Sequence, residues 1–152
     1  MQVRGCSRQS RRGATMVEAA IVLPIVFMFI IGLIVIGMGV YRYQQVASLA
    51  REGARYASVH GGTYASNTGN AAATQTSVYN NAILPMASGL DTSKITYSVT
   101  WPNGNYPTYM ANPTTNTYRI AYVTVTVNYS WTPEAYLSPM TLSSTSTMPI
   151  TY

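Results

Sequence analysis

A single carboxylate, Glu18, lies at the head of a long uncharged segment near the N-terminus. It stands five residues after Arg11-Arg12-Gly13 and is followed by 22 residues, Ala19 to Val40, that carry no charge. A carboxylate at the edge of a membrane-length apolar segment is costly unless it is paired or solvated, so it usually serves a function. The chemistry open to this position is ion pairing with a cation or solvation among lipid headgroups.

Side chains that could support catalysis are few. The chain has one histidine, His60, and one cysteine, Cys6. The other acids are Glu52, Asp91 and Glu134, which lie far apart in the sequence. There is no spacing typical of metal ligands, no glycine-rich phosphate loop and no Ser/His/Asp grouping that stands out. We therefore expect no enzyme activity, no metal site and no cofactor.

The formal net charge is +5, but the excess of basic residues is concentrated at the N-terminus. Four arginines fall within the first thirteen residues: Arg4, Arg8, Arg11 and Arg12. The rest of the chain carries five basic and four acidic groups. A basic tail before an apolar helix is typical of a cytoplasmic anchor that sets membrane topology, and it does not indicate nucleic-acid binding. We expect residues 1–13 to be a basic cytoplasmic leader.

The uncharged segment has the length of a membrane-spanning helix. As a helix, Ala19 to Val40 would extend about 33 Å, at about 1.5 Å per residue, which matches a hydrocarbon core of about 30 Å. A cleavable secretory signal would be shorter and would end in a small-residue site, whereas this segment passes directly into Tyr41-Arg42-Tyr43. We expect residues 14–40 to be a retained transmembrane helix with a cytoplasmic N-terminus.

Pro24 lies inside this segment and removes one backbone hydrogen bond, which favours a kink near residues 20–24. Gly32, Gly37 and Gly39 would allow another helix to approach closely. Proline and glycine are also common in membrane helices without any special role. The sequence leaves open whether these residues serve helix–helix packing.

Three segments together resemble a known family. They are Arg12-Gly13-Ala14-Thr15-Met16-Val17-Glu18-Ala19, then Val22-Leu23-Pro24, then Ala50-Arg51-Glu52-Gly53-Ala54-Arg55-Tyr56-Ala57. They are similar to the TadE-like family, which comprises minor pilins or pseudopilins of the tight-adherence (Flp) pilus within the type IV pilin superfamily. The resemblance covers about residues 11 to 60. One departure is Ala19, where the family often carries phenylalanine.

The resemblance implies that a prepilin peptidase cuts between Gly13 and Ala14 on the cytoplasmic side. Numbered from Ala14, Glu18 is the fifth residue, where the family carries a glutamate. The cut would create an α-ammonium group at Ala14. In an assembled bundle, the Glu18 carboxylate of one subunit could pair with this ammonium on a neighbour and fix the packing register, because either charge alone is costly. The alternative, that Glu18 only reaches the headgroup level, stays open.

Residues 41–62 continue the helix beyond the membrane. A mostly small stripe recurs there at i, i+3 and i+4 spacing: Val46, Leu49, Ala50, Gly53, Ala54 and Ala57. Such a stripe permits close approach of a sheet. Glu52 can pair with Arg55 at i+3, and the helix should end at Gly61-Gly62.

Residues 63–152 are expected to form an exported α+β domain. Thr63 to Asn70 is interpreted as a turn-rich linker, and Ala71 to Leu84 as a short helix stopped by Pro85. Period-two alternation predicts three antiparallel strands, in the runs Ile95 to Trp101, Ala121 to Trp131 and Leu142 to Ile150. Their apolar face should pack on the small stripe and the short helix. Pro102 to Thr117 is interpreted as a long exposed loop.

These features favour a minor pilin anchored in the inner membrane, with its C-terminal domain outside the cytoplasm and with a place in or below the pilus. The implied partners are a prepilin peptidase, the major pilin, other minor pilins, the inner-membrane assembly platform and the lipid bilayer. One alternative is an uncleaved single-pass protein that presents an extracytoplasmic binding domain. Another is an unspecialised single-pass protein of an export apparatus, in which Glu18 would be dispensable. Cleavage of the Gly13–Ala14 bond distinguishes the first hypothesis from the second.

Overall fold

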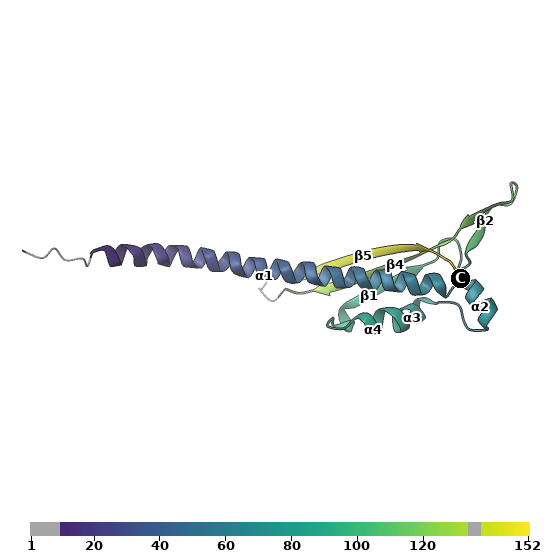
Figure 1. Cartoon of the computed structure of the whole chain (residues 1–152), viewed down its shortest axis with the longest axis horizontal. Coiled ribbons are helices and arrows are strands. Elements are labelled where there is room, and N and C mark those ends of the chain that lie inside the picture. The colour runs from purple at the N-terminus through teal and green to yellow at the C-terminus, as the bar shows by residue number, and fades with distance from the viewer. Residues whose placement is uncertain (1–9, 134–137) are drawn as a thin grey trace, which may run out of the picture. The chain divides into compact units, whose positions relative to one another are not determined.

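The computed structural model describes residues 10–133 and 138–152. The chain divides into two compact units, residues 1–38 and 39–152, and the helix α1 contributes to both. The second unit adds short helical segments, a three-stranded sheet and a two-stranded sheet (Figure 1). The predicted α+β class, with a long N-terminal helix and a small antiparallel sheet, is confirmed.

Helix α1 runs without a break from Ser10 to Val59. It ends slightly before the predicted end at Gly61-Gly62. The His60 N–H still donates to the Tyr56 carbonyl at 3.2 Å, but the Gly61 N–H donates to the carbonyl of Tyr152 at 2.8 Å instead of continuing the helix. A side chain at Gly61 would collide with that same carbonyl, so the C-terminal residue both ends α1 and requires a glycine there.

A short helix, α2 (Gly62–Thr68), replaces the predicted linker, so that prediction is wrong. Its serine and threonine hydroxyls satisfy helix carbonyls one turn back: Ser66 Oγ donates to Gly62 O at 3.0 Å and Thr68 Oγ1 to Tyr64 O at 2.7 Å. Gly69, at φ 73°, adopts the left-handed conformation that closes the helix, and its N–H donates to Ala65 O.

The second predicted helix forms, but with shifted ends. It comprises α3 (Gln75–Val78), the π-helical turn η1 (Tyr79–Ile83) and α4 (Leu84–Met86). It starts later than Ala71 because Thr74 caps it: Thr74 Oγ1 accepts from the Ser77 N–H at 3.2 Å, and Ser77 Oγ accepts from the Thr74 N–H at 2.8 Å. Pro85 does not stop the segment, which continues one residue further, to Met86.

A 3₁₀ turn, η2 (Thr92–Lys94), leads into the larger sheet. The sheet contains β1 (Ile95–Thr100), β4 (Tyr122–Trp131) and β5 (Met140–Pro149), in the order β1-β4-β5. Both pairings are antiparallel, with Val99 opposite Val125 and Val127 opposite Ser144. The three strands predicted from alternation are therefore confirmed.

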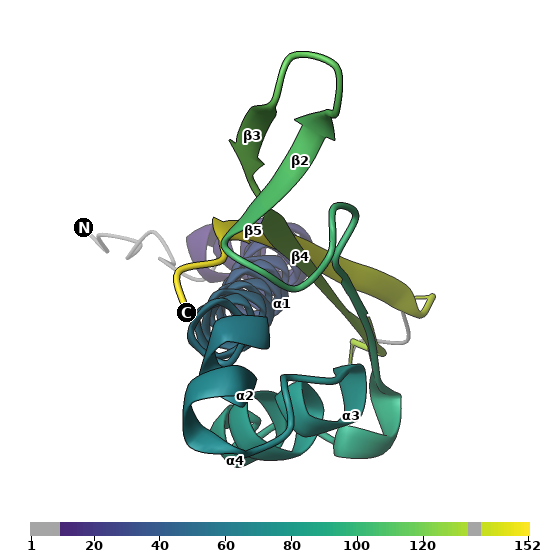
Figure 2. The ribbon, with the colours of Figure 1, turned by 90° about the vertical axis from the view of Figure 1, so that its right-hand side faces the viewer.

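The apolar face of this sheet packs on α1 and on the α3–η1–α4 segment, as predicted. Figure 2 shows α1 nearly end-on, with β4 and β5 on one side and α2 to α4 on another. The buried cluster draws on all three parts: Val46, Leu49, Ala50, Ala54 and Ala57 from α1; Val78 and Ile83 from the helical segment; Ile95, Val99, Val123, Val125, Val127 and Tyr129 from the sheet.

The opposite face of the sheet is polar. Threonine hydroxyls on neighbouring strands contact each other, Thr124 with Thr147 at 3.1 Å and Thr126 with Thr145 at 2.9 Å. Residues at alternate positions of the strands thus meet either the core or solvent, which is the arrangement that a sheet covered on one side requires.

Sequence reasoning missed one element. The segment interpreted as a long loop contains β2 (Thr108–Asn112), and β3 (Thr117–Ile120) follows; the two pair as a hairpin. Asn116, at φ 55°, supplies the left-handed residue of its turn. The five residues of β2 do not alternate polar and apolar residues, and the alternation in β3 covers only four residues, so the hairpin has a weak period-two signature.

Gly53 is a position where α1 leaves little room for a side chain. A Cβ there would lie 3.2 Å from Val125 Cγ1 and 3.3 Å from Ile83 Cγ1. We expect Gly53→Leu to lower the free energy of unfolding by about 3 kcal/mol, because overpacked side chains must leave their rotamers. Urea unfolding of the detergent-solubilised chain, followed by Trp101 and Trp131 fluorescence, measures this.

The matched control is Ser48→Leu, which adds a leucine to an exposed position of the same helix. We expect its unfolding free energy to change by less than about 0.5 kcal/mol. Equal stability of the two variants would show that α1 is not closely packed at Gly53.

Candidate functional site

The Gly13–Ala14 bond lies in the first turn of α1, which begins at Ser10. Gly13 is exposed, and a Cβ placed on it would meet no atom within 4 Å. The first N–H groups of a helix have no intrahelical acceptor, and glycine is a weak helix former. Only one turn must therefore unwind to present this bond in extended form to a protease.

The basic residues predicted to form the leader are only partly described. Arg4 and Arg8 lie outside the described residues. Arg11 and Arg12 belong to the first turn of α1, and the structure describes their backbone but not their side chains. Their predicted role as a topology-setting anchor stays a prediction.

Glu18 lies one helical turn beyond Ala14 on α1 and is exposed. Residues four apart share a helix face and are separated by about 6 Å along the axis. Within the described part of the chain, the ion pairs at or below 4.0 Å are Arg55 with Glu52 and Lys94 with Asp91. The described side chains thus give Glu18 no ion-pair partner.

The apolar part of α1 is uncovered. Met28 and Phe29 are 76% and 72% exposed, and most of the large apolar residues between Met16 and Ile36 are exposed with them. By length and composition, Thr15–Val59 is long and apolar enough to cross a membrane, with a mean hydropathy of 3.1 in its best window. So large an apolar surface needs a lipid or protein environment, which indicates single-pass membrane anchoring.

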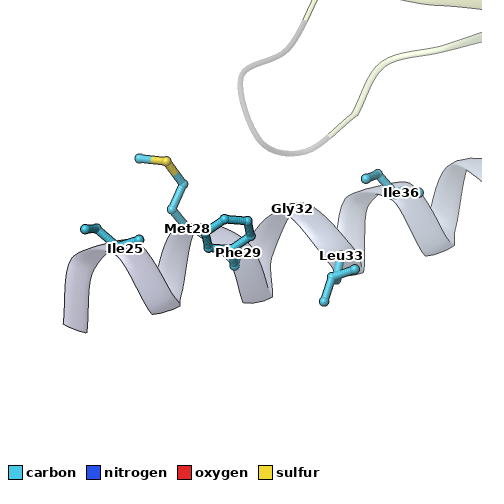
Figure 3. Close-up of a pocket in the computed structure, with 6 residues that line it drawn as sticks. All are labelled: Ile25, Met28, Phe29, Gly32, Leu33 and Ile36. Carbon is cyan, nitrogen blue, oxygen red and sulfur yellow. The ribbon is translucent and has the colours of Figure 1, made fainter. Parts of the chain in front are cut away.

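Pro24 lies within α1, which continues through it as an α-helix. Eight residues later, Gly32 leaves a hollow in one side of the helix (Figure 3). The hollow is about 320 Å³ and is lined by Ile25, Met28, Phe29, Gly32, Leu33 and Ile36. These positions follow the i, i+3, i+4 spacing of one helix face, so a side chain of a neighbouring helix could fit between them.

Two acids of the second unit, Glu52 and Asp91, have partners close to them in the sequence. The predicted pair of Glu52 and Arg55 is confirmed at 2.6 Å, and this hydrogen bond holds the pKa of the Glu52 carboxyl below its usual value. Hydrogen bonds from the Ser93 hydroxyl and N–H likewise lower the pKa of Asp91. The ion pairs of Glu52 with Arg55 and of Asp91 with Lys94 are both largely exposed. Each therefore contributes little to the stability of the fold.

His60 lies at the end of α1 and contacts aromatic rings instead of acids. Its ring stacks on Tyr56, with centroids 4.0 Å apart, and meets the edge of Tyr64 at 4.6 Å. Its Nδ1 is 2.9 Å from the Tyr56 carbonyl oxygen. Among the described residues, no group of three or more His, Cys, Asp or Glu side chains could hold a metal ion.

Membrane anchoring by α1 can be tested with charges. Two arginines at the centre of the segment, Ile30→Arg with Leu33→Arg, should raise the free energy of insertion by roughly 5–7 kcal/mol, at about 2.5–3.5 kcal/mol each. We expect most of this variant to be released from membranes by alkaline carbonate, whereas the native chain stays bound.

The control pair, Gln44→Arg with Ser48→Arg, places the same charges at exposed positions of α1 beyond residue 40. It should stay membrane-bound. If carbonate extracts both variants to the same extent, residues 14–40 are not the segment that crosses the membrane.

Comparison with known proteins finds a family match over the N-terminal part of the chain. Residues 13–55 match the family described as TadE-like protein. Searches of curated proteins and of solved structures gave no match. The match begins at the glycine of the junction and includes Glu18, Pro24 and most of the small stripe on α1. The resemblance predicted from the sequence is therefore confirmed over residues 13–55, and this match together with the long apolar helix fits a pilus-associated membrane protein.

Proposed function

We propose that this protein is a minor pilin, or pseudopilin, of a tight-adherence, type IV-like pilus assembly and secretion machinery. One observation carries the proposal: the TadE-like match starts at Gly13, and the only acid of the apolar helix is the fifth residue after it. The proposed role is structural, in assembly, and not catalytic.

In this proposal the basic leader stays in the cytoplasm and residues 14–40 cross the inner membrane. The unit that contains the sheet is then extracytoplasmic. This orientation is supported by the four arginines clustered in the leader, whereas Arg42 is the one basic residue within the first ten positions after the apolar segment.

A prepilin peptidase cuts the Gly13–Ala14 bond in the next step. The position of this bond in the first helical turn favours its access, since few hydrogen bonds must break. Ala14 then carries a new α-ammonium group, and the leader arginines leave with the removed peptide.

Glu18 acts during assembly. Among the described side chains no cation pairs with it, and the proposed partner is the new N-terminus of a neighbouring subunit. Pairing with the Ala14 ammonium of a neighbouring pilin would fix the stagger of adjacent helices, because a shifted packing would bury an unpaired charge. The exposed apolar surface and the hollow at Gly32 provide contacts for the major pilin and other minor pilins.

The N-terminal mass of the protein taken from membranes of its own host tests the processing step. A chain that begins at Ala14 is expected. A chain that keeps Met1 to Gly13 would favour the alternative, an uncleaved single-pass protein that presents an extracytoplasmic binding domain.

A side chain at the junction should block processing. We expect Gly13→Arg to accumulate as the full-length precursor, because a peptidase that admits only glycine has no room for a side chain. Ser10→Arg adds the same charge three residues earlier and should be processed normally. Correct cleavage of the Gly13 variant, seen by mass spectrometry, would remove the assignment of the cleavage site.

Removal of the Glu18 carboxylate should leave cleavage of the leader unchanged but prevent assembly of the pilus. We expect Glu18→Leu to be cleaved like the native protein but to abolish piliation, because the Ala14 ammonium loses its partner. Glu52→Leu removes a glutamate paired within its own chain and should leave piliation intact. Normal pili on cells with the Glu18 variant, counted by electron microscopy, would exclude the pairing role.

A further inference from the structure

One end of the larger sheet lies against the last turn of the apolar segment of α1. The ring of Trp131, at the end of β4, rests on the helix at Gly39, where an added Cβ would lie 3.0 Å from Cζ3 and 3.2 Å from Cη2 of that ring. Gly39 is the penultimate residue of the uncharged run that ends at Val40. The sheet therefore extends along α1 as far as residues proposed to lie in the membrane.

At this end the sheet carries apolar side chains past the core. Trp131 alternates with the buried residues Val127 and Tyr129, so it belongs to the face that packs on α1. Met140 of β5 stands directly opposite Trp131, and opposite residues of antiparallel strands share a face. Yet Met140 is 43% exposed, and Trp131 is only partly buried. The core thus ends before the last pair of the sheet does.

Two tyrosines of α1 lie at the same level as Trp131. Tyr41 and Tyr43 are 61% and 49% exposed. Positions 39 to 43 span only about 6 Å of the helix axis, at about 1.5 Å per residue. Because residues two apart on a helix point to different sides, the three rings are distributed around α1.

Two basic side chains belong to the same end of the second unit. Arg42 lies between the two tyrosines and donates to the carbonyl of Gly89, which brings the turn after α4 to this end. Lys94 directly precedes Ile95, whose partner Tyr129 is near the end of β4, and the Lys94 side chain is 45% exposed. Long basic side chains beside aromatic rings are typical of a membrane–water interface.

We propose that this end of the second unit, with Tyr41, Tyr43, Trp131 and Met140, lies in the headgroup region of the bilayer that α1 crosses. Tyrosine and tryptophan favour this region because one end of each ring is apolar and the other is polar. Lipid is the expected partner because these residues continue directly from the apolar segment, so the molecules that surround that segment also meet them.

The proposal rests on the part of the proposed function that places residues 14–40 in the membrane, and not on cleavage at Gly13. It adds that the sheet itself contacts lipid, so the second unit is held at the membrane surface by more than one helix. The residues that carry it all lie within residues 39–152.

The chain has two tryptophans, and they lie at opposite ends of the sheet. Trp101 follows Thr100, which pairs with Thr124, and from Thr124 to Trp131 the strand extends about 23 Å, at about 3.3 Å per residue. Single-tryptophan variants of the full chain in phosphatidylcholine vesicles therefore compare the two ends. The quencher is phosphatidylcholine brominated on its acyl chains close to the headgroup.

We expect Trp101→Phe, which keeps Trp131, to lose at least half of its fluorescence when brominated lipid replaces the ordinary lipid. Trp131→Phe, which keeps Trp101, should lose less than a tenth. The native chain should lose more than Trp131→Phe, which tests the proposal even if Trp101→Phe does not fold. Circular dichroism checks the fold of each variant.

A second measurement leaves both tryptophans in place. Met140→Cys and Met110→Cys, each combined with Cys6→Ser, put a nitroxide label on an exposed methionine position at the Trp131 end of the sheet or on the hairpin. In vesicles, the label at position 140 should be more accessible to oxygen than to a water-soluble nickel chelate. The label at position 110 should show the reverse.

The proposal is overturned if Trp131 keeps its fluorescence in brominated vesicles, if both tryptophans are quenched equally, or if the label at position 140 favours the nickel chelate. An unquenched Trp131 whose emission shifts to the red on dilution with lipid would assign this end to a second copy of the protein. Carbonate extraction of the same vesicles separates the two kinds of failure. A released chain contradicts anchoring by α1 and this proposal with it, whereas a retained chain with unquenched Trp131 contradicts this proposal alone.

Discussion

The packing of β4 against the small-residue stripe of α1 is the contact on which the second unit depends. At Gly53 the helix backbone approaches Val125 on one side and Ile83 on another, so neither element could come as close to a larger residue. Ala50, Ala54 and Ala57 are fully buried beside it. Because alanine and glycine offer little apolar area of their own, the valines of β4 and the residues of the α3–η1–α4 segment supply most of the buried surface.

One continuous helix therefore meets two different requirements. Beyond residue 40 its stripe is narrow and small, and the polar faces on either side carry Arg51 and the Glu52–Arg55 pair. From Ala19 to Ile36 it is apolar on every side, and most of its large side chains are exposed. The first pattern suits a helix packed in a water-exposed domain, and the second suits one surrounded by lipid or by other apolar helices. The change of pattern falls close to the boundary between the two compact units.

Because the chain has few charged residues, the presence or absence of a partner for each one helps to locate contacts with other molecules. Glu52 and Asp91 have local partners, and Arg42 donates to the carbonyl of Gly89 and to Gln45. Glu18 and Arg119 have no carboxylate or cation partner among the described residues. Glu18 lies at the head of the apolar helix, and the proposed function rests on it.

The sequence by itself determined the features that repeat locally. The length of the uncharged segment predicted the apolar helix, and the spacing of small residues at 3.6 per turn predicted the Val46–Ala57 stripe. The alternation of polar and apolar residues predicted strands β1, β4 and β5. The register from Gly13 to Glu18 also follows from the sequence, since it needs no contact between distant residues, and it led directly to the family. Tertiary structure decided the rest: Tyr152 ends α1 by accepting from Gly61, and pairing between β2 and β3 turns an apparent loop into a hairpin. That hairpin could not be predicted, because it depends on cross-strand pairing and on residue types that are equally common in loops.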